Sequence, residues 1–499
     1  MLPSDMSGRF LGELRSALRS ALWGDVDARH VALLRILTMA VWLHDLARMA
    51  PFVSLHYDPI VGSAEVWFAA WVLTTLAVLL GFHARLFSAL GFIVTSIFVT
   101  LDHVIYHVDY YLLLTFFYFM FIETDRAWSV RSWLAARRGA ALSRRVWVGP
   151  VTLFSLHLAF IYLNAGLAHI LLNRSWREGY ALSQSFANPV WRAPAGEFLA
   201  HLGVPTWPMD FGTIALEVGF APLWIYAVLR PAARELRIVL AFALIAFHVA
   251  IAVFLNIGAF SHYVIATAIV FFPTAWIFRA VPGSPELAPA PADQATARRG
   301  VALAFLSFFL LLALLVQPPV DELALRRPKL ADVLERAKRT LALTGDVRHH
   351  NVFPEVVTER VFYTVIYFAG GERLELWPLL FDERGERVGW GTDMRIFMSL
   401  RLPLRGLGVS TVQGKALPVN DALRVLQIAL PLLKRDLTLQ RNLWVSEVRI
   451  LSRGYVLGRK LGDPYVAGPT TTPIACFRVE RTPELGLVPS PCKAPSGSD

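Results

Sequence analysis

Lysine is absent from the first 328 residues of this 499-residue chain, because all six lysines lie between Lys329 and Lys493. Charge of both signs is scarce: Asp, Glu, Lys and Arg make up 17% of the residues, whereas 55% are hydrophobic. This composition is far from that of a soluble domain and indicates a polytopic membrane protein. The absence of lysine also leaves the apolar part of the chain without an amine side chain for chemistry.

The net charge of +10 does not indicate a nucleic-acid-binding protein. Arginines account for 42 of the 48 basic residues, and many of them stand in short segments between apolar runs. That distribution is typical of the signal that orients a membrane protein, not of a phosphate-binding face.

Cysteine is also scarce, with only Cys476 and Cys492 near the C-terminus. If this region lies outside the cytoplasm, the two can form one disulfide; two free thiols are the alternative. Both possibilities stay open at the level of the sequence.

The first 30 residues have neither a long apolar core nor a small-residue cleavage pattern, so a cleaved signal peptide is not expected. The stretch FLGELRSALRSALWG instead predicts an amphipathic helix at the membrane surface, with Arg15 and Arg19 on its polar side.

Nine apolar runs approach the length of one membrane crossing, about 20 residues. They lie at residues 31–50, 64–83, 86–105, 109–122, 146–172, 212–229, 237–256, 259–279 and 300–317. The fourth run is short, and it is compatible with a tilted or re-entrant segment. Nine crossings would place the two termini on opposite sides of the membrane.

The arginine distribution predicts the orientation of the chain in the membrane, because cytoplasmic loops are enriched in basic residues. With the N-terminus inside, seventeen arginines fall in the inner segments and three, Arg174, Arg177 and Arg192, in the outer ones. The sequence therefore predicts a multi-pass cell membrane protein with a cytoplasmic N-terminus and an extracytoplasmic C-terminal domain.

The predicted fold is an all-α membrane bundle of about nine helices, followed by a β-rich α+β extracytoplasmic domain. Strand-like alternation around Gly-rich turns and one helical stretch predict that second part. The expected organisation is a cytoplasmic N-terminus at 1–30, a transmembrane domain at 31–279, a Pro/Ala-rich cytoplasmic linker at 280–299, a last helix at 300–317 and the outer domain at 318–499.

Polar residues of the apolar runs concentrate toward the predicted outer side, judged at ~1.5 Å of rise per residue. They are His44, Asp45, Arg48, Asp102, His103, His107, Asp109, His169, Glu217, Asn256 and His262, while His157 and His248 lie deeper and Arg35 alone lies toward the cytoplasmic side. One such residue alone is readily explained by snorkelling or by a structural pair, such as Asp45 with Arg48. Their shared asymmetry predicts a polar cavity that opens outward beneath the C-terminal domain.

The run that begins at Val146 carries the richest set of polar groups: His157, Asn164 and His169, followed by a turn from Trp176 to Gly179. Ionisable groups at membrane depth are costly and are functional candidates by default. We predict His157, Asn164, Trp176 and His248 as cofactor-binding residues. Asp45, Arg48, Asp102, His103 and His262 are predicted to form a substrate-binding or structural polar network.

Several short motifs occur in an order that resembles one family. They are Leu80-Gly81-Phe82-His83-Ala84-Arg85, D-x-x-W-S at Asp125, Y-x-x-A-G at Tyr162, W-x-x-G-Y at Trp176, Phe247-His248 and G-x-F-S at Gly258. Over residues 31–279 the chain resembles the horizontally transferred transmembrane (HTTM) domain family, to which the vitamin K-dependent γ-glutamyl carboxylase belongs.

This resemblance implies acid–base chemistry on a reduced quinone such as a vitamin K-like naphthoquinol. In the carboxylase, a lysine three residues after the A-G pair is the base that deprotonates the reduced cofactor. His169 stands at that position here. A second functional position of the family, a histidine, falls near Asp109 and His107.

A histidine is a suitable base near neutral pH, and a carboxylate partner raises its basicity. The sequence thus predicts His169 as the base, with Asp109 or Glu217 as its partner and His107 as a further catalytic candidate, acting on a quinol and a periplasmic peptide or small substrate. A lyase of the carboxylase type is one outcome. The alternative is a non-catalytic lipid-binding or assembly protein.

A metal-dependent membrane oxygenase is the third alternative. His103 and His107 stand four residues apart, the spacing of two ligands on one helical face. No second pair with this spacing follows, and the turn between the third and fourth runs is expected to break the helix. We therefore predict no metal ligand.

Overall fold

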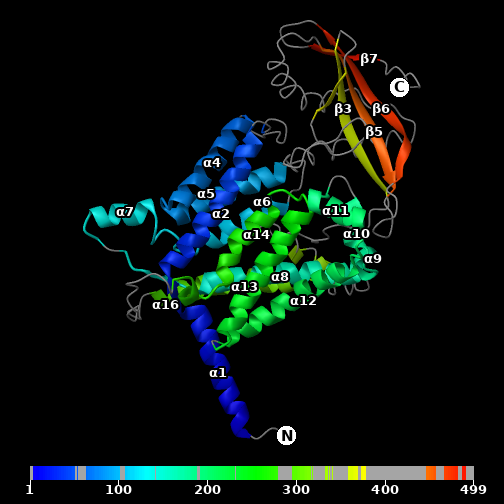
Figure 1. Ribbon diagram of the computed structural model, residues 1–499. Coiled ribbons are helices and arrows are strands. Elements are labelled where there is room, and N and C mark those ends of the chain that lie inside the picture. The colour runs from blue at the N-terminus through cyan, green and yellow to red at the C-terminus, as the bar shows by residue number, and fades with distance from the viewer. Residues whose placement is uncertain are drawn as a thin grey trace.

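The computed structural model describes most of the chain up to residue 315 and five strands near its C-terminus (Figure 1). The described residues are 4–50, 53, 63–101, 107–140, 142–187, 191–230, 232–278, 295–315, 317, 332–334, 336–337, 340, 358–368, 373–377, 445–456, 466–480 and 486–490.

Apolar helices build the first part of the chain. Four of them are long and apolar enough to cross a membrane: α2 (Ala28–Met49), α8 (Gly149–Leu172), α12 (Trp207–Leu229) and α13 (Arg234–Phe254). Shorter apolar helices occupy the other predicted runs, namely α4 (Ala64–Leu80), α5 (Ala84–Leu101), α6 (His107–Phe119), α14 (Phe260–Thr267) with η2 (Ala268–Phe271), and α16 (Ala295–Leu315). The prediction of a helical membrane bundle is confirmed at this level, whereas nine crossings stay a prediction.

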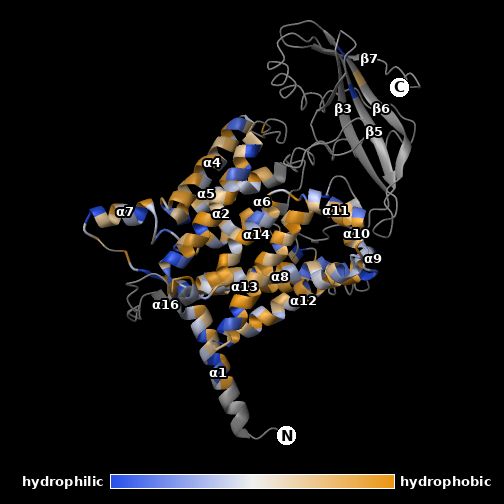
Figure 2. Ribbon diagram, viewed as in Figure 1, coloured by the Kyte–Doolittle hydropathy of each residue, from blue (hydrophilic) through white to orange (hydrophobic). Residues whose placement is uncertain are grey.

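The remaining helices are short or polar. They are α1 (Ser4–Trp23), α7 (Val130–Arg137), α9 (Arg174–Arg177), α10 (Ala181–Ala187), α11 (Pro194–Leu202) and α15 (Thr274–Ile277). Figure 1 shows α9, α10 and α11 gathered at one end of the bundle. Figure 2 shows hydrophobic residues along the bundle helices, with hydrophilic residues more frequent on α1, on α7 and around α9.

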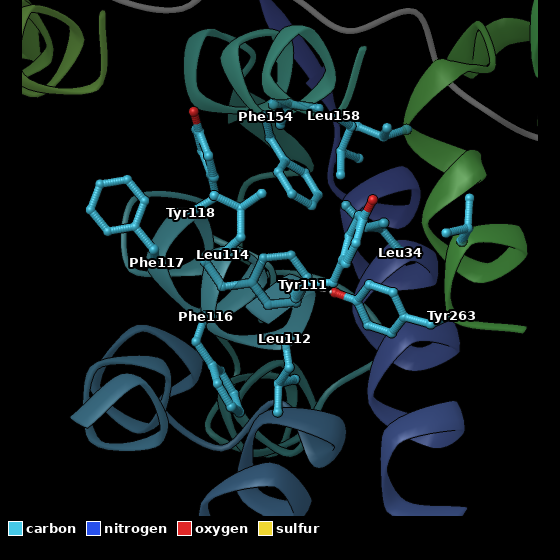
Figure 3. Close-up of a cluster of buried hydrophobic side chains, with 14 of the residues drawn as sticks. Leu34, Tyr111, Leu112, Leu114, Phe116, Phe117, Tyr118, Phe154, Leu158 and Tyr263 are labelled. Atoms are coloured by element: carbon cyan, nitrogen blue, oxygen red, sulfur yellow. Dashed lines mark hydrogen bonds between the residues drawn. The ribbon is translucent and has the colours of Figure 1, made fainter. Parts of the chain in front are cut away.

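Helix α6 is the buried centre of the bundle. Its side chains from Val108 to Phe119 are buried on nearly all sides, which is the pattern of a helix enclosed by other helices. Figure 3 shows its aromatic and leucine side chains against Phe154 and Leu158 of α8 and Tyr263 of α14. With 13 residues, α6 is ~20 Å long, shorter than the hydrocarbon core of a bilayer.

Several helix ends meet on one side of the bundle. Strand β1 (Asp25–Asp27) pairs antiparallel with β2 (Arg145–Trp147), which brings the starts of α2 and α8 together. Asp25 lies 3.7 Å from Arg145 and 3.8 Å from Arg299 of α16. These are the ends that the arginine distribution assigns to the cytoplasm, although the side of the membrane itself stays a prediction.

Two of the short motifs, the one from Leu80 to Arg85 and the D-x-x-W-S motif at Asp125, contact each other and Arg35; we call this contact region the Arg35 joint. Gly81 ends α4 in the left-handed conformation, at φ 65°, and lies against Arg35 of α2. The Arg35 side chain is fully buried and donates a hydrogen bond to the backbone oxygen of Trp128. Asp125 accepts hydrogen bonds from the backbone N–H of Ala84 and from Arg131. The two motifs therefore fasten the α4–α5 turn to the segment before α7.

The C-terminal strands form one antiparallel sheet in the order β4-β3-β5-β6-β7. Their bounds are β3 (Thr358–Phe368), β4 (Arg373–Trp377), β5 (Val445–Val456), β6 (Val466–Glu480) and β7 (Gly486–Ser490). All five strands fall within residues 318–499, the part of the chain that the sequence predicts as β-rich. The extracytoplasmic location of this sheet stays a prediction.

Cys476 of β6 is disulfide-bonded, and Cys492 is the other cysteine of the chain. Alkylation of the denatured, unreduced protein is therefore expected to modify neither cysteine, and alkylation after reduction is expected to modify both. Peptide mass spectrometry measures the difference. Modification of Cys476 without reduction would contradict the bond. A disulfide is typical of oxidising compartments, so this result would also support the predicted outward location.

Candidate functional site

A cavity of about 300 Å³ lies where α8, α12 and α13 meet the short helices α9 and α10. Its wall is mostly aliphatic and aromatic, with contributions from Ile161, Phe186, Met209, Ile251, Phe254 and Phe260. Its few polar groups come from His169, Glu217, Tyr162, His248 and Thr213. An apolar wall with a few convergent polar groups is the usual composition of a small-molecule site.

His169 and Glu217 form the polar centre of this cavity. His169 Nε2 lies 3.5 Å from Glu217 Oε2, and both side chains are more than nine-tenths buried. The His169 ring stacks on Trp176, with ring centres 4.1 Å apart and planes 14° from parallel. Within the described part of the chain, His169 Nδ1 and Glu217 Oε2 have no hydrogen-bond partner. Buried polar atoms in this state are costly and call for an explanation, of which a bound ligand is one.

Gly166 allows this pair to form. It lies one turn before His169 on α8, where α12 passes close by. A β-carbon at Gly166 would lie 2.7 Å from Val218 Cγ2, 2.9 Å from Glu217 Cβ and 3.0 Å from the Val218 backbone nitrogen. Only a glycine admits the backbone of α12 at this distance, and small residues are the general means of close helix packing in membranes. The A-G motif thus sets the separation of His169 and Glu217.

A second polar pair lines the same cavity. The Tyr162 hydroxyl lies 2.6 Å from His248 Nε2, which joins α8 to α13. Within the described residues, His248 Nδ1 has no hydrogen-bond partner. The cavity therefore contains two polar pairs, Glu217 with His169 and Tyr162 with His248.

The structure brings together four of the predicted site residues: His169, Glu217, Trp176 and His248. Asp109, the other predicted partner of His169, is buried in the first turn of α6 and does not line the cavity. The carboxylate beside His169 is Glu217, because α12 lies along α8 at Gly166.

His157 and Asn164, predicted to bind a cofactor, also lie outside the cavity lining. His157 Nδ1 is 3.1 Å from the Tyr118 hydroxyl in the buried centre of the bundle. Asn164 is buried on α8 but does not contribute to the cavity wall. Helical spacing explains both, since each points away from the face that carries Tyr162 and His169.

The predicted polar network is only partly described. Asp45 is buried and Arg48 exposed on α2, and His262 is exposed on α14. None of the three lines the cavity. Asp102, His103 and the side chain of His107 lie outside the described residues, although the backbone of His107 begins α6.

Tyr162 is the functional candidate that the sequence prediction missed. It was recognised only as part of the Y-x-x-A-G motif. Positions 162, 166 and 169 follow one another at helical spacing, so Tyr162, Gly166 and His169 share one face of α8. That spacing is the signal by which Tyr162 could have been assigned to the site.

The described residues contain no group of three or more His, Cys, Asp or Glu side chains that could hold a metal ion. His103, one of the two residues of the H-x-x-x-H spacing, lies outside them.

These observations define a helical membrane protein with a histidine–glutamate site in an apolar cavity. Residues 47–276 match the HTTM domain family. The chain therefore contains an HTTM domain over these residues, as the motifs predict. No curated protein and no solved structure matches the chain. The matched segment includes α8, α12 and α13, and so contains the whole cavity.

Proposed function

We propose that the cavity binds a lipid-soluble reduced quinone and that His169 and Glu217 carry out acid–base chemistry on it. The observation that carries this proposal is the buried His169–Glu217 pair in an otherwise apolar cavity. A quinol has a flat apolar ring and two hydroxyl groups, and both features have a counterpart in the wall.

The residues present fit such a group. The apolar wall suits a ring and an attached hydrocarbon chain, and the cavity volume lies at the small end of the range for ligand sites. His169 Nδ1 and His248 Nδ1 lack hydrogen-bond partners within the described residues, so a hydroxyl-bearing ligand would supply the hydrogen bonds that they lack. Trp176, stacked on His169, fixes the plane of the imidazole.

Glu217 positions the proton on His169. A carboxylate that accepts a hydrogen bond from Nε2–H leaves Nδ1 unprotonated and available as the base. The 3.5 Å separation is long for a hydrogen bond, and such contacts commonly tighten when a ligand binds. When bound, the quinol would supply reducing equivalents and an acidic hydroxyl. His169 would accept the proton in place of the lysine used by the carboxylase.

The predicted topology supports access from outside the cell. The cavity lies at the end of α8 opposite the clustered arginine-rich helix ends, near α9, α10 and α11. A periplasmic peptide or small molecule is the substrate class that this location favours. Carboxylation of that substrate is the reaction suggested by the relationship to the carboxylase.

Mass spectrometry of lipids that remain bound to gently purified protein tests this proposal. We expect a quinone-type compound to be enriched on the wild-type protein. The bound amount is expected to be about tenfold lower in His169→Ala, which corresponds to the loss of one charge-assisted hydrogen bond or ring contact. His157→Ala is the matched control, because His157 is a buried histidine of the same helix that does not line the cavity.

Two outcomes would contradict the proposal. One is that only bulk phospholipid is recovered from both wild type and His169→Ala. The other is that the quinone is retained by His169→Ala but lost from His157→Ala. The first outcome would make a non-catalytic lipid-binding or assembly role the better explanation of the fold.

A further inference from the structure

A second cavity, of about 360 Å³, lies at the opposite end of the bundle from His169. The end of α1, strand β1, the starts of α2, α8 and α13, the end of α12, and the turn from η2 to α15 enclose it. One part of its wall is polar, formed by Ser20, Asp25, His30, Thr152, Arg237 and Thr274. The other part is apolar and includes Val151, Trp224, Val228 and Phe271. The cavity is therefore amphipathic, unlike the mostly apolar one around His169.

The charges around this cavity are predominantly positive. Asp25 is the acidic residue in its wall, and its two carboxylate oxygens face two guanidinium groups, Arg145 at 3.7 Å and Arg299 at 3.8 Å. Arg237 adds a third cation directly in the wall. Arg145 and Arg299 lie outside the cavity lining and compensate the charge of Asp25, whereas Arg237 forms no ion pair within the described residues, so Arg237 is the positive charge that a ligand in the cavity can neutralise.

Arg237 has one nitrogen to offer a ligand. Its Nε donates to the backbone oxygen of Ala227 at 2.9 Å and its Nη2 to that of Val228 at 3.4 Å. These bonds cap the end of α12 and hold the guanidinium in place, with its carbon 5.9 Å from the centre of the Trp224 ring. Among the residues that the structure describes, none accepts a hydrogen bond from Nη1.

Neutral polar groups complete the wall. The Thr274 hydroxyl lies 3.2 Å from His30 Nδ1, and the Thr152 hydroxyl donates to the backbone oxygen of Ala21. Ser20 lines the cavity from the exposed side of α1. The Thr152 hydroxyl has no proton left for a ligand, so the hydroxyl donors beside the fixed guanidinium are Ser20 and, when His30 Nδ1 carries the proton, Thr274.

We propose that this second cavity binds the phosphate group of an amphiphilic or small anionic ligand, with Arg237 as the principal cation. The apolar wall would take the hydrocarbon or ring portion next to that phosphate. Anionic phospholipid is one source, because basic pockets between helices at the cytoplasmic side of membrane proteins bind such headgroups. A soluble phosphate ester is the other source, and both present the same chemistry to Arg237.

Native mass spectrometry of the full-length chain in detergent tests this proposal. The protein is titrated with phosphatidylglycerol and with phosphatidylcholine of the same acyl chains. We expect one phosphatidylglycerol molecule to bind about fivefold more tightly than phosphatidylcholine. This factor corresponds to about 1 kcal/mol, the contribution of one arginine that contacts an anionic lipid headgroup. Added inorganic phosphate then separates the two sources: displacement of the lipid would indicate a site open to soluble phosphates, and persistence would indicate a lipid site.

Two variants and one control assign the binding to this cavity. Arg237→Gln removes the cation, and Ser20→Trp places a large side chain in the wall while Arg237 keeps its bonds to α12. Each is expected to weaken phosphatidylglycerol binding about fivefold. Arg230→Gln is the matched control, because Arg230 pairs with Glu13 at the same end of the bundle but does not line the cavity.

Equal affinity for the two lipids, or wild-type binding by Ser20→Trp, would overturn the proposal. Ser20→Trp keeps the test valid if Arg237→Gln fails to fold through loss of the α12 cap. Loss of binding in Arg230→Gln to the same extent as in Arg237→Gln would also overturn it, because that would indicate general attraction of anionic lipid to a basic surface.

Discussion

Gly166→Leu is expected to lower the stability of the bundle and to remove any ligand bound at His169. The new side chain would occupy the space that Glu217 Cβ and the backbone of Val218 now fill, so α12 must move away from α8. Overpacking of this kind typically costs about 1–3 kcal/mol. The shift would also separate Glu217 from His169. Thermal unfolding of the detergent-purified protein and recovery of bound lipid measure the two effects.

Gly219→Leu is the matched control for this experiment. Gly219 lies on α12, two residues after Glu217, and a β-carbon there would meet no atom within 4 Å. We expect this variant to retain both wild-type stability and the cavity ligand. Equal behaviour of the two leucine variants would show that the close approach at Gly166 does not set the site.

Gly81→Ala is expected to destabilise the protein more strongly, without acting on the cavity directly. Gly81 has φ 65°, which costs an L-residue about 1–2 kcal/mol. Its new β-carbon would in addition overlap the guanidinium of Arg35 and the side chain of Ser129. Arg35 would lose its place beside Trp128, and a buried charge that loses its partners costs about 3–5 kcal/mol. The yield of monodisperse protein and its unfolding temperature report this loss.

Gly139→Ala separates the two components of that effect. Gly139 has a similar backbone angle, φ 70°, but a β-carbon there would meet no atom within 4 Å. This variant should therefore show only the cost of the left-handed backbone, about 1–2 kcal/mol. If Gly81→Ala proved no more destabilising than Gly139→Ala, the contact between Gly81 and Arg35 would not be structurally important.

The two glycine pairs distinguish structural from functional roles of the motifs. Gly81 belongs to the Arg35 joint, which holds the turns at one end of the bundle together. Gly166 belongs to the wall behind His169. We therefore expect surviving Gly81 variants to keep the properties of the cavity, whereas Gly166 variants lose them even where they fold.

The sequence by itself determined those features that depend only on residues close to one another along the chain. Apolar runs long enough for a crossing became helices, because a backbone in lipid must satisfy its own hydrogen bonds. The interval from Tyr162 to His169 placed both residues on one helical face, since that periodicity is local. The ordered motifs indicated the HTTM family, and the arginine distribution gave the predicted orientation.

Only the tertiary structure decided which helix faces which. Local sequence could not choose Glu217 over Asp109 as the neighbour of His169, because that choice depends on the approach of α12 at Gly166. It could not join Tyr162 to His248, or reveal that α6 is buried on nearly all sides. Lipid-facing and helix-facing surfaces of a membrane helix are both apolar, so composition carries little information about partners. Close packing of small residues and a few polar contacts select them instead.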